Sequence, residues 1–334
     1  MMLDKVLVLL DGSTLAQCVL HHARALAETF GAEMTLLRVL EVEDKDTHTQ
    51  VDPVNWHLRK VEAQSYLNSL LYGWPPSEAP PQIVLDEGTA VSRVINYVET
   101  HKPDLVMLST HGQSGLSNSP ISSVAHKIIH LIPGSFMLVR AHQAQPKKSE
   151  TAPYKRIMVP LDGSRRAECV LPFATKLAAA HEAELFLVHV VPQAEMIQRR
   201  PFSPEETTMY TQLQQRNQRE AEYYLHDIAD HEEFPVKTRL LSEARVADAL
   251  LDFANSEQID LVMMCAHGQS GGNNRLYGSL INNFIYYSSA ALFVLQDLPA
   301  DQIQLFKLNQ MTPITTGGLD RNIAYAQPEN WKPD

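Results

Sequence analysis

Hydrophobic residues in this chain gather in short runs that alternate with longer segments of mixed polarity. The run at residues 5–10 is apolar throughout, which is typical of a strand buried on both faces. In the next segment, apolar side chains recur near one helical face as far as Phe30, and Gly31 can end that helix. The same criteria predict strands at about 33–40, 82–86, 104–109 and 135–140, and helices at about 53–71, 89–101 and 120–131.

The second half of the chain repeats this order of elements. We predict strands near 156–161, 184–191, 236–241, 260–265 and 291–295, with a long polar helix within 203–232. Strands that alternate with helices of this length imply right-handed crossovers and a parallel sheet. The sequence therefore predicts an α/β fold of two tandem domains, each a five-stranded parallel sheet flanked by helices.

Two motifs occur in both halves at matching places. Asp-Gly-Ser follows the first strand at Asp11 and again at Asp162, which is 151 residues later. His-Gly-Gln-Ser-Gly follows the fourth strand at His111 and again at His267, which is 156 residues later. A unit of about 150 residues has therefore been duplicated. We predict a first domain at 1–141, a linker at 142–153, a second domain at 154–297 and a polar C-terminal tail at 298–334.

Composition narrows the range of functions. Hydrophobic residues make up 44% of the chain and charged residues 20%, as in ordinary soluble proteins, and the net charge of −11 disfavours a nucleic-acid or anionic-membrane surface. No secretory signal and no run of ~20 apolar residues is present, so we expect a cytoplasmic protein that does not cross a membrane. We interpret Cys18, Cys169 and Cys265 as small buried hydrophobes. Their odd number and lack of clustering argue against a disulfide framework.

The loops after the first and fourth strands are the candidate functional site in each half. In a doubly wound sheet these strands flank the point where strand order reverses, so the two loops should face each other across a crevice. Glycine lets the backbone approach a ligand, and the following helix points free N–H groups at it. An aspartate on the opposite side suits a ribose hydroxyl or an adenine amino group. This pattern favours a nucleotide.

These motifs, in this order, resemble those of the universal stress protein (UspA) superfamily. The resemblance covers about 1–140 and 154–296, and Gly278-Ser279 stands ten residues beyond Gly268, as that family requires. It implies a Rossmann-like fold of the adenine nucleotide alpha hydrolase-like type. It also implies that the two domains pair as two single-domain subunits do, with their last strands contributing to the interface. A further homodimer is an open possibility.

One branch of that family binds ATP through a signature of Gly, two residues, Gly, nine residues, and Gly followed by Ser or Thr. The second copy keeps this pattern except that Cys265 replaces the first glycine. The first copy has Ser109 in place of the first glycine and Ser122-Ser123 in place of the last Gly-Ser pair. Because Ser122 could block a backbone conformation that only glycine adopts easily, we expect the second copy to be the better site.

The resemblance implies roles for residues of the second copy. Gly268, Gly278 and Ser279 would hold phosphates, Asp162 would contact the adenosine portion, and Val190 would meet the adenine. The implied nucleotide-binding residues are Asp162, Val190, Cys265, Gly268, Gly278, Ser279 and Leu280 in the second copy, and more weakly Asp11, Val39, Gly112, Ser122 and Ser123 in the first. Arg275, inside the glycine loop, could neutralise a phosphate or simply be solvated.

The resemblance implies a regulatory module of the stress response that binds ATP, or AMP or ADP, with Mg²⁺ as a companion ion. An interaction or scaffold protein that has lost nucleotide is the alternative, favoured by the altered positions Cys265, Ser109 and Ser122. A slow ATPase is disfavoured because we find no nucleophile elbow, no Walker A lysine and no paired carboxylates. We expect no metal site: His126 and His130 lie four residues apart, but no third ligand is nearby in sequence.

Overall fold

The computed structural model describes residues 3–41, 52–72, 74, 79–113, 115, 119–141, 154–193, 202–269 and 276–298. The predicted linker at 142–153 and the predicted tail beyond Leu298 lie outside the described residues. We call residues 3–141 the first copy and residues 154–298 the second copy. The exact domain boundaries remain predictions.

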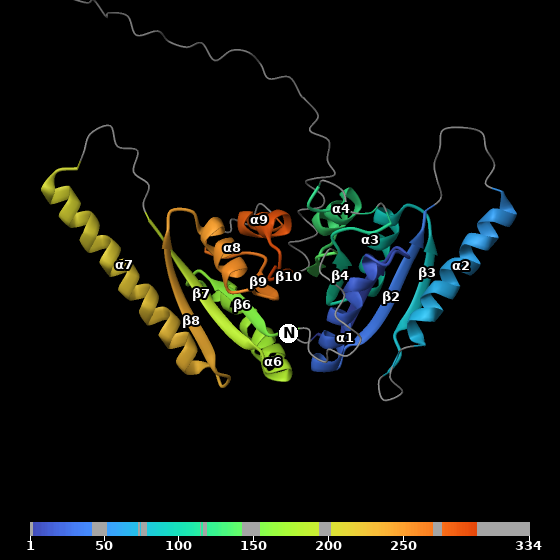
Figure 1. The fold of residues 1–334 in the computed structure, drawn as a ribbon, viewed down its shortest axis with the longest axis horizontal. Coiled ribbons are helices and arrows are strands. Elements are labelled where there is room, and N and C mark those ends of the chain that lie inside the picture. Colours follow the sequence, from blue (N-terminus) through green and yellow to red (C-terminus); the bar gives the residue numbers. More distant parts are fainter. Residues whose placement is uncertain are drawn as a thin grey trace, which may run out of the picture.

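Each copy alternates strands with helices, as the hydrophobic pattern predicts (Figure 1). The first copy contains β1 (Lys5–Leu10), a 3₁₀ turn (Ala16–Cys18), α1 (Val19–Phe30), β2 (Glu33–Leu40), α2 (Pro53–Leu71), β3 (Gln82–Glu87), α3 (Ala90–His101), β4 (Leu105–Ser109), α4 (Ser123–Leu131) and β5 (Ser135–Val139). The second contains β6 (Arg156–Leu161), α5 (Arg165–Glu168), α6 (Leu171–His181), β7 (Glu184–Pro192), α7 (Pro204–His231), β8 (Val236–Glu243), α8 (Val246–Ser256), β9 (Leu261–Cys265), α9 (Ser279–Tyr287) and β10 (Ala291–Leu295).

The strands of both copies form one continuous sheet. Its order is β3-β2-β1-β4-β5-β10-β9-β6-β7-β8, and neighbouring strands within each copy run parallel. β5 and β10 pair antiparallel, with Leu292 opposite Leu138 and Val294 opposite Phe136. The last strands therefore join the two copies, as the family resemblance implied. The two copies are related by an approximate two-fold axis at this junction.

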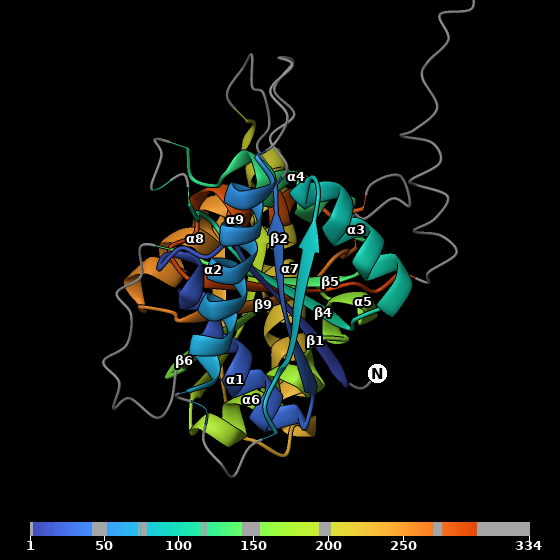
Figure 2. The ribbon, with the colours of Figure 1, turned by 90° about the vertical axis from the view of Figure 1, so that its right-hand side faces the viewer.

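Helices cover both faces of this sheet and bury a core on each (Figures 1 and 2). The core on one face includes residues of α1, α2, α6 and α7, and the core on the other includes residues of α3, α4, α8 and α9. Successive strand residues alternate between the faces: Val6 and Val8 belong to the first core and Leu7 to the second. Each core runs through both copies, so the copies fold around shared packing.

The strand order places the candidate loops as expected. β1 lies between β2 and β4, and β6 lies between β7 and β9. Strand order therefore reverses at β1 and β6, and the loops after β1 and β4, and after β6 and β9, meet at the carboxyl end of the sheet. The equivalent helices α1 and α6 each end at a left-handed residue, Gly31 at φ 72° and Glu182 at φ 51°.

Candidate functional site

A cavity of about 710 Å³ lies at the carboxyl ends of β6, β7 and β9, beside the start of α9. Its lining combines apolar side chains, such as Val188 and Met264, with a polar rim. All seven residues that the sequence predicted for the second copy line this cavity: Asp162, Val190, Cys265, Gly268, Gly278, Ser279 and Leu280. The structure thus brings together residues from four separate segments of the second copy.

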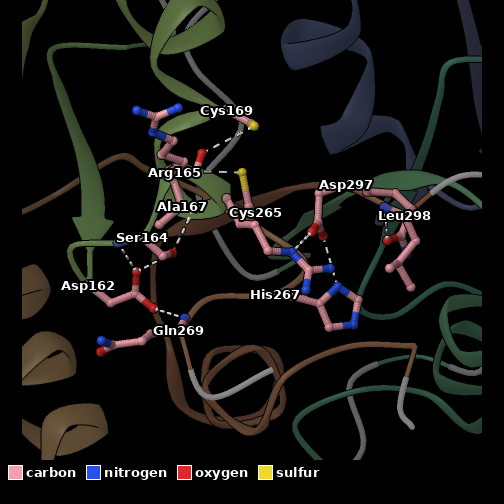
Figure 3. A network of polar contacts seen from close by, with 12 residues as sticks. Asp162, Ser164, Arg165, Ala167, Cys169, Cys265, His267, Gln269, Asp297 and Leu298 are labelled. Atoms are coloured by element: carbon pink, nitrogen blue, oxygen red, sulfur yellow. Dashed lines mark hydrogen bonds and ion pairs between the residues drawn. The ribbon is translucent and has the colours of Figure 1, made fainter. Parts of the chain in front are cut away.

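Asp162 ties the two loops of the site together (Figure 3). Its Oδ1 accepts hydrogen bonds from the backbone N–H of Ser164 (3.0 Å) and from the Ser164 hydroxyl (2.6 Å). Its Oδ2 accepts one from the backbone N–H of Gln269 (2.5 Å), in the loop after β9. A carboxylate oxygen accepts up to two hydrogen bonds, so Oδ2 keeps one free position for a ligand. Asp11 makes the same bonds with Ser13 and with the backbone N–H of Gln113.

Gly268 is required by this carboxylate. A β-carbon on Gly268 would lie 2.0 Å from Asp162 Oδ2, and one on Gly112 would lie 1.8 Å from Asp11 Oδ2. No side chain fits there while the aspartate holds its position. The aspartate after the first strand and the glycine after the fourth are therefore one structural unit in both copies.

Gly278 and Ser122 differ less in backbone conformation than the sequence suggested. Gly278 has φ −66° and ψ 162°, and Ser122 has φ −67° and ψ 151°, both in the region open to any residue. The expectation that Ser122 blocks a glycine-only conformation is wrong. Both backbone N–H groups also donate alike, Gly278 to Ala266 O (2.9 Å) and Ser122 to Thr110 O (2.7 Å).

The two turns differ instead in how they begin the next helix. The Ser122 hydroxyl accepts from the backbone N–H of Ala125 (3.2 Å) and so caps α4. Gly278 has no side chain, and α9 begins without a side-chain cap. The first N–H groups of α9 have no partner inside the helix and lie beside the cavity, where they favour an anion.

Comparison with known proteins places this architecture in a family. The sequence matches the universal stress protein family over residues 2–140 and again over 153–295. The chain belongs to the universal stress protein family. Over 136 residues, 41% of this chain and 92% of the relative, it is 26% identical to universal stress protein A homolog 1 of Coxiella burnetii (strain RSA 493 / Nine Mile phase I).

Solved structures share the fold of this universal stress protein. A universal stress protein from Archaeoglobus fulgidus DSM 4304 is 16% identical, with a TM-score of 0.60 over 89% of this chain and 99% of that chain. A functionally unknown protein from Pseudomonas aeruginosa PAO1 is 13% identical, with a TM-score of 0.59 over 93% of this chain and 98% of that chain. At these identities the likeness concerns the fold alone.

The cysteines do not share one environment. Cys265 is buried, its thiol donates to Ala167 O (3.7 Å), and burial raises the pKa of that thiol. Cys18 is also buried, and burial raises the pKa of its thiol to about 12. Cys169 is exposed between α5 and α6, so its interpretation as a buried hydrophobe is wrong. At the position of Cys265, the first copy has Ser109, whose hydroxyl donates to His111 O (2.7 Å).

His267 has an acidic partner that the sequence did not reveal. Its Nδ1 lies 2.8 Å from Asp297 Oδ1 (Figure 3). Arg166 Nε donates to Asp297 Oδ2 (2.5 Å). Burial acts to raise the pKa of Asp297, but the hydrogen bonds from His267 and Arg166 outweigh it and lower that pKa. Asp297 follows the last strand, thirty residues beyond His267, and no motif marks it.

The copies also differ beside the aspartate. In the first copy, the guanidinium of Arg38 lies 5.1 Å from the centre of the Tyr66 ring and within 2.5 Å of where a β-carbon on Gly12 would stand. The equivalent residue in the second copy is His189, whose Nδ1 lies 2.8 Å from Leu161 O. A hollow of about 370 Å³, lined by His189, Glu220 and other residues, opens there beside Asp162.

Three further expectations concern Arg275, membrane-spanning helices and metal sites. Arg275 lies outside the described residues. Within the part of the chain that the structure describes, no helix combines the length and apolarity needed to span a membrane. Across the same residues, no group of three or more His, Cys, Asp or Glu side chains is arranged to hold a metal ion.

Proposed function

We propose that this universal stress protein binds an adenine nucleotide in the cavity of its second copy and acts as a regulatory module of the stress response. The observation that supports this most strongly is the start of α9, which has no side-chain cap and lies at one side of a cavity with apolar walls and a polar rim. Apolar walls suit a base, and free N–H groups at a helix start suit phosphates.

Different lining residues contact different parts of the nucleotide. Val190 contacts the adenine, and the backbone N–H groups of Gly268 and Ser279 donate to the phosphates. Gly278, whose own N–H donates to Ala266 O, leaves room for the phosphates beside them. Asp162 receives a ribose hydroxyl at the remaining position on Oδ2, because its other acceptor positions are used within the protein. If the ligand is ATP, Mg²⁺ arrives with the phosphates. The cavity volume of about 710 Å³ lies within the range of ordinary small-molecule sites.

The first copy is the weaker site under this proposal. The Ser122 hydroxyl already occupies an N–H group at the start of α4, leaving fewer free donors for a phosphate. Its other site residues, Asp11, Val39, Gly112 and Ser123, keep the order seen in the second copy.

The test is to denature the purified full chain and identify any released nucleotide by mass spectrometry, with its amount per chain. Purified apo protein is then titrated with ATP, ADP and AMP by calorimetry, with and without Mg²⁺. We expect one adenylate per chain to bind more tightly than any second. No released adenylate, together with no heat and no thermal stabilisation by any of the three, would favour an interaction protein that does not bind nucleotide.

A matched pair of variants tests which copy binds the nucleotide. Leu280→Arg places a long charged side chain in the cavity lining of the second copy, and Val124→Arg changes its equivalent on α4, which is 39% exposed. We expect the first variant to lose adenylate binding and the second to keep it. The reverse result would place the working site in the first copy.

A further inference from the structure

The seam between the copies holds a pair of histidines that the nucleotide site does not use. His126 and His130 lie one turn apart on α4, and their Nε2 atoms are 3.0 Å apart. Their ring centroids are only 4.3 Å apart, with the planes at 65°. The rings therefore stand nearly side by side, with both Nε2 atoms toward a common point, because rings placed tip to tip would have centroids much farther apart than their nitrogens.

This separation matches that of two metal ligands. Imidazole nitrogens bind Zn²⁺ and similar ions at about 2.0–2.1 Å. Two such nitrogens at about a right angle around one ion are then about 3 Å apart, which is the tetragonal arrangement that Cu²⁺ and Ni²⁺ prefer. An ion could therefore replace the hydrogen that the two nitrogens share, with little movement of α4.

The opposite helix supplies a third donor across the approximate two-fold axis. The His126 ring lies 5.8 Å from the Tyr286 ring on α9, so the two helices contact each other here. Figure 1 shows α4 and α9 at the same end of the molecule, on either side of the junction. The 156-residue correspondence pairs His126 with Asn282 and His130 with Tyr286. The approximate axis maps the pair His126 and Tyr286 onto the pair Asn282 and His130, so by symmetry we infer that Asn282 faces His130 across the junction.

Asn282 has an oxygen available for this purpose. Its Oδ1 is buried and has no hydrogen-bond partner among the described residues. A buried oxygen without a partner is unfavourable, and a cation satisfies it.

We propose that His126, His130 and Asn282 bind one divalent transition-metal ion of the class that prefers imidazole, represented by Ni²⁺ and Cu²⁺, at the seam between the copies. Both rings then carry their proton on Nδ1, and water completes the coordination. The site depends on the asparagine oxygen as third ligand, and so differs from clusters made only of histidines, cysteines and carboxylates. Spacing along the chain does not reveal that oxygen, because Asn282 lies in the other copy.

The test is calorimetric titration of the untagged full chain with NiCl₂ and, in parallel, with MgCl₂. We expect one equivalent of Ni²⁺ to bind and no Mg²⁺, since Mg²⁺ prefers oxygen ligands. His126→Gln and His130→Gln should each weaken Ni²⁺ binding at least tenfold, and Asn282→Ala severalfold. His57→Gln, which removes an exposed histidine from α2, should leave Ni²⁺ binding unchanged.

A second measurement covers the case in which a variant fails to fold. Anomalous diffraction from wild-type crystals soaked in NiCl₂ should show one peak beside the two Nε2 atoms. Absence of Ni²⁺ binding by the wild-type chain would overturn the proposal. So would affinity unchanged in both histidine variants, or an anomalous peak located only elsewhere.

Discussion

At the residue scale, the close approach of Asp162 to Gly268 separates two glycines that look alike in the motif. A β-carbon at Gly268 would meet Asp162 Oδ2 at 2.0 Å, whereas one at Gly278 would meet Ala266 O at 3.5 Å, an ordinary contact. The first glycine therefore serves the fold, and the second leaves space beside the cavity at the start of α9.

We predict that Gly268→Ala lowers the free energy of unfolding by about 1–3 kcal/mol, because the loop or the aspartate must move. Gly278→Ala should change it by less than about 0.5 kcal/mol, because its backbone conformation suits any residue. Urea unfolding of both variants measures the difference. Asp162→Ala should remove much of the cost of Gly268→Ala in the double variant. Equal destabilisation by the two glycine variants would contradict the assignment.

The sequence revealed the members of the site but only part of their chemistry. Asp162 and Gly268 could be predicted to meet because strand order alone brings the ends of β6 and β9 together. The backbone conformation of Ser122 could not be predicted. A glycine in a motif shows that the backbone there is free to adopt many conformations, but it does not show that the fold uses one that other residues avoid. Asp297 was missed since its contact with His267 depends on the chain path after β10.

At the scale of elements, α4 and α9 are equivalent helices with different first turns. Ser122 caps α4 through the N–H of Ala125, and α9 begins at Gly278 without a side-chain cap. A serine cap and a phosphate compete for the same N–H groups. The start of each helix should therefore decide how well its copy binds an anion.

Exchanging these two residues tests that relation. We expect Gly278→Ser to weaken adenylate binding in the second copy at least tenfold, while stability changes by only a few tenths of a kcal/mol. Ser122→Gly should strengthen binding in the first copy, seen as a second equivalent in calorimetry. If Gly278→Ser binds adenylate as tightly as the wild type, the helix start does not hold the phosphates.

The hydrophobic pattern predicted most elements within one or two residues. β1, β6 and β10 have the expected bounds because buried parallel strands are continuous apolar runs. The helix α2 also has the expected bounds. The helix expected at 120–131 begins only at Ser123, since Ser122 is extended and caps it. The helix after β1 is preceded by a separate 3₁₀ turn at Ala16–Cys18, which periodicity does not distinguish from α-helix.

At the scale of the whole molecule, α1 of the first copy packs against α6 of the second around Tyr154. The Tyr154 hydroxyl lies 2.9 Å from His22 Nδ1, and its ring lies 5.3 Å from that of His181. Burial, and then the proximity of His21, lowers the pKa of His22 to about 4. The junction between the copies is therefore most favourable when this histidine is neutral.

We predict a loss of stability in acid that depends on His22. The pKa of His22 is about 4 in the folded chain and near 6.5 in the unfolded chain, so the unfolded chain gains the proton first as pH falls. Stability should be complete above pH ~6.5 and fall by about 1–3 kcal/mol between there and pH ~4. Urea unfolding across that range should show that the free energy of unfolding changes less steeply with pH in His22→Gln than in the wild type. An identical slope would show that His22 does not control it.

Arg140 forms a second set of contacts between the copies. It contacts α9, the helix that begins at the proposed nucleotide site. It is 2% exposed at the end of β5, and its guanidinium donates to the carbonyls of Phe284, Ile285 (2.8 Å) and Ala290 (3.4 Å). Two of these carbonyls belong to the last turn of α9, where a positive charge is favourable. Burial lowers the pKa of Arg140 to about 10, which still leaves it charged at neutral pH.

We predict that Arg140→Gln lowers the free energy of unfolding by about 3 kcal/mol or more, because buried carbonyls lose their donors. Glutamine is the natural choice, since Gln296 occupies the equivalent place in the second copy and its side chain donates within that copy, to Leu276 O. Arg245→Gln, which removes an exposed ion pair with Asp248, should cost under about 1 kcal/mol. Because α9 begins at the cavity, hydrogen exchange in Arg140→Gln should also rise at residues 279–283. Unchanged exchange there would limit Arg140 to joining the two copies.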